Sequence, residues 1–99
     1  MKLMSGMDIK HIELRGRGAF VIKRGHERIA ELTYKKEDGE INIDHTEVDK
    51  SLRGQGVGEQ LVEEAVKFVR ENELKIRATC PYASKVLSRN GEYSDVYVS

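Results

Sequence analysis

The chain has 99 residues, which is enough for one hydrophobic core and predicts a single domain over residues 1–99. Seventeen basic and 17 acidic residues cancel to a formal net charge of +0. This balance argues against nucleic-acid and anionic-membrane partners, because both select for a basic excess. One cysteine excludes an intrachain disulfide and suits a reducing compartment. We find no apolar run typical of a signal peptide or membrane span, so we expect a cytoplasmic protein in which residues 1–6 are disordered.

The first half of the chain alternates polar and apolar residues as β-strands do. We expect four strands, over Asp8–Leu14, Ala19–Lys23, Arg28–Tyr34 and Ile41–Val48. The first two flank Arg15-Gly16-Arg17-Gly18, a hairpin-like turn whose two glycines are free to adopt positive φ. Asp38-Gly39 is a second hairpin signal. In the fourth strand, Ile41 and Ile43 define the buried face.

The second half begins with a change of period. From Gln55 to Asn72, apolar residues form the stripe of an amphipathic helix. Leu74–Cys80 alternates again and predicts a strand, and Pro81 favours the first turn of a shorter helix that ends near Arg89. Asp95–Ser99 has the pattern of a last strand. The order is four strands, helix, strand, helix and strand, which predicts an α/β fold.

Three glycines at alternate positions, Gly54, Gly56 and Gly58, separate a strand from the long helix. Backbone N–H groups can approach a ligand closely at such residues. The helix N-terminus adds roughly half a positive charge, and Arg53 adds a full one beside it. The loop therefore predicts a site for a di-anionic group such as pyrophosphate, although a plain strand-to-helix turn is an alternative. Its spacing fits neither a P-loop nor a dinucleotide-binding loop.

The segment from Val48 to Gly58 reads VDKSLRGQGVG. It resembles the signature of the GNAT superfamily of acetyltransferases, in which Arg/Gln-x-x-Gly-x-Gly/Ala follows a strand and leads into a helix. The resemblance extends from about Glu40 to the C-terminus. It implies a GNAT-type α/β fold: a mixed, mostly antiparallel sheet with two helices packed against it.

The same resemblance implies acetyl-CoA (coenzyme A) as cofactor. The family's loop amides hold the pyrophosphate, and the matching residues are Arg53, Gly54, Gln55, Gly56, Val57 and Gly58. The strand that ends near Val48 pairs its backbone with the pantetheine arm, which adds Thr46 and Val48 to the cofactor-binding residues.

The second helix region departs from the family pattern Asn-x-x-Ala-x-x-Leu-Tyr at two positions. Cys80 stands where many members have an asparagine that contacts CoA, and Leu87 stands where many have the tyrosine that protonates the leaving thiolate. Because strand patterns begin almost at the start of this sequence, we expect no counterpart in it of the N-terminal helices that usually shape the acceptor pocket. In these respects the chain resembles very small, stand-alone GNAT-like proteins, in which a cysteine and a histidine near the cofactor are the suspected functional groups.

Cys80 and His45 are accordingly the candidate catalytic residues. A cysteine at the start of a helix is favoured as thiolate, which could take the acetyl group from the thioester and pass it on. His45 lies in the strand expected beside the acyl group and could act as general base or thiol partner, with Glu47 on the same strand face to orient it. Each has a structural alternative, as a small buried hydrophobe and as a half-buried strand residue respectively.

The remaining side chains carry weaker predictions. His11 and His26 are expected at the surface, and Tyr82 either packs over the cofactor or core or protonates a departing thiolate. One cysteine and scattered histidines do not predict a zinc site, so we expect no metal.

Taken together, the residues and the GNAT resemblance imply an acetyltransferase that uses acetyl-CoA and acts on an unknown small-molecule or protein acceptor, and we expect a monomer or weak dimer. A non-catalytic acyl-CoA-binding or sensing module is the alternative.

Overall fold

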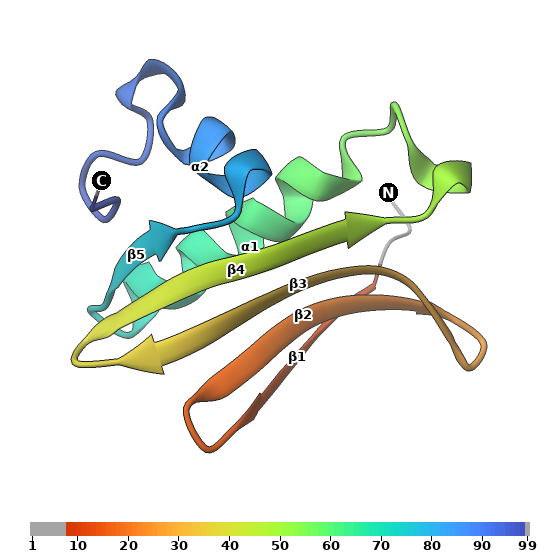
Figure 1. Ribbon diagram of the computed structural model, residues 1–99, viewed down its shortest axis with the longest axis horizontal. Coiled ribbons are helices and arrows are strands. Elements are labelled where there is room, and N and C mark those ends of the chain that lie inside the picture. The colour runs from red at the N-terminus through yellow and green to blue at the C-terminus, as the bar shows by residue number, and fades with distance from the viewer. Residues whose placement is uncertain (1–7, 99) are drawn as a thin grey trace.

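The computed structural model describes residues 8–98, so the expected disorder of residues 1–6 falls outside it. One five-stranded sheet runs in the order β1-β2-β3-β4-β5 (Figure 1). Its strands are β1 (Ile9–Leu14), β2 (Arg17–Arg24), β3 (Glu27–Glu37), β4 (Glu40–Val48) and β5 (Lys75–Ala78). The first four pair as an antiparallel meander, and β5 pairs in parallel with β4. The expected mixed, mostly antiparallel sheet is confirmed.

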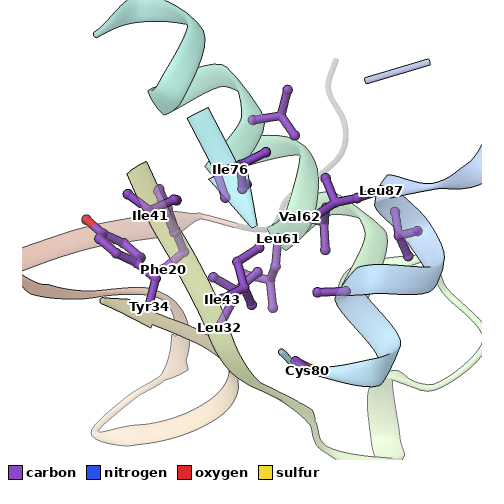
Figure 2. Packing of buried hydrophobic residues seen from close by; sticks show 14 of the residues in the cluster. Phe20, Leu32, Tyr34, Ile41, Ile43, Leu61, Val62, Ile76, Cys80 and Leu87 are labelled. Atoms are coloured by element: carbon purple, nitrogen blue, oxygen red, sulfur yellow. The ribbon is translucent and has the colours of Figure 1, made fainter. Parts of the chain in front are cut away.

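Two helices pack on one face of this sheet (Figure 1). They are α1 (Val57–Glu71), which crosses from β4 to β5, and α2 (Pro81–Leu87), which follows β5. The inner face of α1 is fully apolar, with Leu61, Val62, Ala65, Val66 and Val69 buried. Figure 2 shows this layer, with Ile43 of β4 and Ile76 of β5 beneath the helices and Cys80 at the start of α2. The packing follows from the helical and strand periods of the sequence.

The predicted last strand, Asp95–Ser99, is not formed over the residues that the structure describes. Tyr97 makes a single parallel bridge to Ile76, with Val98 N donating to Ile76 O at 2.9 Å. The segment before it turns instead of extending, because Val96 N and Tyr97 N both donate to Tyr93 O, at 3.0 and 2.8 Å. Buried Tyr93 and Val96 anchor this turn in the core, so local propensity for a strand is overridden by packing.

A β-bulge in β4 decides which of its side chains face the helices. Tyr34 pairs with Ile43, but the next residue back along β3, Thr33, pairs with His45, so Asp44 is an extra residue. The Asp44 carboxylate accepts a hydrogen bond from Thr33 Oγ1 at 2.6 Å. One inserted residue reverses the alternation of faces. Before the bulge the odd-numbered residues of β4 face the helices, and after it the even-numbered residues do.

His11 has an exposed side, as expected, but its ring packs inward. It stacks on Phe20 with ring centroids 4.2 Å apart, and its Nε2 lies 2.6 Å from Tyr34 Oη. Burial lowers the pKa of His11, and the nearby Glu13 carboxylate opposes the shift. The folded protein therefore favours neutral His11. Its contribution to stability is complete above the ordinary pKa of 6.5 and is lost as pH falls through the lowered folded-state pKa.

We expect His11→Phe to reduce the pH dependence of stability. Phenylalanine keeps the stack on Phe20 but has no proton to gain, so its free energy of unfolding should fall less than that of the parent between about pH 7.5 and about pH 5.5. Urea denaturation at each pH measures both curves. Parallel pH profiles would show that His11 does not titrate differently in the folded and unfolded chains.

Within residues 8–98, no helix has the length and apolar character required to cross a bilayer.

Candidate functional site

The site begins where β4 and β5 separate. Thr79 N and Cys80 N both donate to Ile43 O, at 3.0 and 3.1 Å, and strand pairing ends there. β4 continues to Val48 beyond the end of β5 (Figure 1). This separation leaves residues 44–48, the second half of β4, with one edge that β5 does not cover.

The free edge of β4 presents backbone groups to that gap. Asp49 N donates to Ile29 O of β3 at 2.8 Å, so by the alternation of an antiparallel pair the N–H and C=O groups of Thr46 and Val48 point the other way, toward the gap. Unpaired strand-edge groups need a partner. The geometry therefore suits an extended ligand with amide groups of its own.

The chain leaves β4 through a short 3₁₀ turn, Lys50–Leu52, that Asp49 caps. The Asp49 carboxylate accepts from Ser51 N at 2.9 Å and from Ser51 Oγ at 2.6 Å, and these bonds lower the pKa of Asp49. Gly54 and Gly56 follow with φ of 82° and 73°, the left-handed region where side chains are strained. The two glycines thus allow the backbone to turn sharply into α1.

The start of α1 is electropositive. Its first N–H groups have no partner inside the helix, and among the described side chains none caps them. Glu59 is the acidic residue of the first turn, and its Oε2 is paired with Arg89 Nη1 at 2.6 Å. Since Arg89 compensates that carboxylate, the partial positive charge of the helix remains available to an anion, with the exposed Arg53 beside it.

These elements enclose a cleft of about 520 Å³ between the β4 edge, the glycine loop and α2. Its lining is Thr46, Val48, Leu52, Arg53, Gly54, Gly56, Val57, Gly58, Glu59 and Tyr82. One end is therefore polar and positive, and the rest has apolar and backbone surface.

Tyr82 closes one side of the cleft by lying against Gly58. A Cβ at Gly58 would come within 2.7 Å of Tyr82 Oη, so glycine is required there for this contact. Burial, and secondarily the charge of Glu59, raise the pKa of Tyr82. The hydroxyl consequently keeps its proton at neutral pH.

All of the predicted cofactor-binding residues line the cleft except Gln55. The Gln55 side chain instead donates from Nε2 to Ser51 O at 3.2 Å, across the loop. Two residues were not predicted as parts of the site: Leu52, which lines the cleft, and Arg89, which pairs with Glu59. Leu52 is an apolar residue in a turn, and Arg89 reaches Glu59 across 30 positions of sequence, so neither carried a local signal.

Cys80 is the N-cap residue of α2, as expected from Pro81 at the first helical position. It is 8% exposed and does not itself line the cleft. Its Sγ lies 3.5 Å from Oγ1 of Thr46, which does line the cleft. The thiol is therefore one side chain away from the cleft.

His45 and Cys80 are not brought together. Thr46, whose Oγ1 contacts the Cys80 thiol, faces the helices. Adjacent residues of a strand point to opposite faces of the sheet. His45 lies on the other face, where its Nε2 is 3.3 Å from Glu47 Oε1 and 3.8 Å from Glu31 Oε2. The role of His45 as thiol partner, one of the two that the sequence suggested, is not supported by this geometry, because the bulge at Asp44 turns His45 away from the side of Ile41 and Ile43.

Comparison with known proteins is consistent with this geometry. The family model described as GCN5-related N-acetyl-transferase matches residues 19–96. A solution structure of a GCN5-like N-acetyltransferase candidate from Staphylococcus aureus is 41% identical, covers 97% of this chain and 92% of its own, and superposes with a TM-score of 0.74. Protein NATD1 of Xenopus tropicalis is 29% identical over 86 residues, which are 87% of this chain and 79% of that protein.

A more distant structure shares the fold. A streptothricin acetyltransferase candidate from Bacillus anthracis, solved in complex with acetyl coenzyme A, is 24% identical, with a TM-score of 0.54 over 67% of this chain and 39% of its own. The family model covers the glycine loop, the free edge of β4 and both helices. The chain belongs to the GCN5-related N-acetyltransferase family.

Proposed function

We propose that this protein binds acetyl-CoA in the cleft and transfers its acetyl group through Cys80 to an acceptor. The observation that carries the proposal is the cleft itself, which joins an uncapped helix start, two left-handed glycines and the free edge of β4. The positive end suits the pyrophosphate, and the β4 edge suits the amides of the pantetheine arm.

The chemistry of transfer would use the Cys80 thiolate. Its sulfur attacks the carbonyl carbon of the thioester, a new S–C bond forms, and the C–S bond to CoA breaks. The proton that the Cys80 thiol gives up ends on the departing CoA thiolate, and the Tyr82 hydroxyl, which lines the cleft, can relay it. An acceptor nucleophile then attacks the acetyl group and displaces the Cys80 sulfur, and the proton of the acceptor restores the Cys80 thiol. We give His45 no part in this proposal, because it lies on the other face of β4.

Intact-mass analysis after incubation with acetyl-CoA tests the proposal. We expect one acetyl adduct on the parent protein and none on Cys80→Ala, since the chain contains a single cysteine. Cys80→Ala should keep acetyl-CoA affinity within about 1 kcal/mol, because anchor and nucleophile are separate groups. Thermal denaturation with and without acetyl-CoA measures that affinity.

The intact-mass and thermal measurements also distinguish acetyl transfer from the alternative function. Thermal stabilisation without an adduct or turnover would contradict the Cys80 mechanism and favour an acyl-CoA-binding or sensing module. Leu87 favours that alternative, because it is buried and apolar where many family members carry the proton-donating tyrosine.

A further inference from the structure

The face of the sheet opposite the helices carries a second cluster of chemically active side chains. Glu31 of β3 and His45 and Glu47 of β4 converge there, and one ligand atom from each lies within 4.8 Å of the other two. The proposed acetyl transfer uses none of them. They lie on the other side of β4 from the cleft, so the cluster is a separate site.

The two glutamates form an unfavourable pair by themselves. Glu31 and Glu47 are directly opposite each other in the β3–β4 register, and like charges at such positions destabilise a sheet. Arg28 Nη1 lies 3.1 Å from Glu31 Oε1, which leaves Oε2 directed toward His45. One carboxylate oxygen of each glutamate therefore lies near the imidazole. Among residues 8–98, no arginine or lysine forms an ion pair with Glu47.

The bulge in β4 places the imidazole between these oxygens. His45 Nε2 is 3.3 Å from Glu47 Oε1 and 3.8 Å from Glu31 Oε2. In a tetrahedral Zn²⁺ site with ligands at ~2.1 Å, neighbouring ligand atoms are about 3.4 Å apart. Small side-chain rotations would bring the three atoms to that spacing.

The cluster is also accessible and has room for solvent ligands. The His45 side chain is 50% exposed. A hollow of about 130 Å³ adjoins the two glutamates, and its charged lining residues are Glu31, Glu47, Asp49 and Arg28. Two carboxylates and one imidazole are a donor set for transition-metal dications, whereas Ca²⁺ and Mg²⁺ prefer oxygen ligands alone.

We propose that Glu31, His45 and Glu47 bind a Zn²⁺-class dication on the helix-free face of the sheet, with an open coordination position for water. This inference replaces the sequence-based expectation of no metal and gives His45 a role distinct from Cys80. It rests on these three residues and does not depend on the proposed acetyl transfer.

Calorimetric titration of the full chain with Zn²⁺ tests the site. We expect saturable binding of one equivalent, and His45→Gln and Glu31→Gln should each weaken it by about tenfold or more, since each removes one of three protein ligands. His26→Gln, at an exposed histidine in the turn between β2 and β3, and Cys80→Ser should leave the affinity unchanged.

The imidazole ¹⁵N signals provide a second readout on the unaltered protein. Zn²⁺ should shift the signals of His45 and leave those of His11 and His26 in place. Absence of saturable binding would overturn the proposal. So would binding that survives both His45→Gln and Glu31→Gln, or binding that is lost in Cys80→Ser or His26→Gln.

Discussion

Gly56→Val should abolish acetyl-CoA binding while the protein remains folded. Gly56 has φ 73° and is the N-cap of α1, so a branched side chain both strains the backbone and projects where a phosphate would approach the helix. A ligand at 100 times its Kd adds about 2.7 kcal/mol, which raises the Tm of a domain of this size by roughly 11–22 °C. The parent should show this rise in thermal denaturation, and Gly56→Val should show none.

Gly39→Val is the matched control for that experiment. Gly39 has φ 79°, and a Cβ there would meet no other atom within 4 Å, just as at Gly56. It lies in the β3–β4 turn, however, at the opposite end of β4 from the cleft (Figure 1). Both variants should lose about 1–3 kcal/mol of stability from backbone strain. Only Gly39→Val should keep the full stabilisation by acetyl-CoA, and an equal response in the two variants would mean that the glycine loop is only a connection.

Gly18→Ala should destabilise the fold strongly although its backbone is unstrained. A Cβ at Gly18 would lie 2.2 Å from Cζ of Tyr34, the residue directly opposite in the β2–β3 register. The Tyr34 ring is fully buried and cannot move aside freely, because its hydroxyl lies 2.6 Å from His11 Nε2 and donates to Glu13 Oε2 at 3.1 Å. Overpacking of this kind costs about 3 kcal/mol, or roughly 12–24 °C in Tm.

Gly39→Ala provides the comparison for Gly18→Ala. Backbone conformation alone would make Gly39→Ala the more damaging change, because Gly39 has positive φ and a left-handed non-glycine residue costs roughly 1–2 kcal/mol. An added Cβ at Gly39 meets no steric clash, since the space around it is open. The contact with Tyr34 reverses that order. Urea denaturation of both variants decides the matter, and a Gly18→Ala protein as stable as Gly39→Ala would show that the Tyr34 ring adapts.

The sequence by itself determined the local elements and the conformation of the glycine loop. The helical stripe from Val57 onward and the strand alternation before it are local patterns, and each forms close to its expected bounds because periodic burial on one face is the main driving force. The loop from Arg53 to Gly58 was predictable for a similar reason. Glycines that take positive φ and a helix that lacks a cap are visible in a few consecutive residues.

Contacts between distant residues were decided only by the tertiary structure. Gly18 was expected to serve a turn, yet it lies within β2 and is required by the Tyr34 ring. Arg89 neutralises Glu59, and Tyr82 packs on Gly58, through the way α2 meets the start of α1. The expected last strand turned instead, because Tyr93 and Val96 are buried in the core. No short window of sequence contains both partners of such contacts.

The face on which His45 lies is the clearest case. Strict alternation from Ile41 and Ile43 places His45 and Glu47 on the helix side, near Cys80. One extra residue at Asp44 reverses this order, so that Thr46 reaches the thiol and His45 meets Glu31. The bulge depends on how β3 pairs with β4, because two residues of one strand must oppose one of the other. Strand pairing is a tertiary property, and a single-residue shift in it moved a candidate catalytic side chain to the opposite face of the protein.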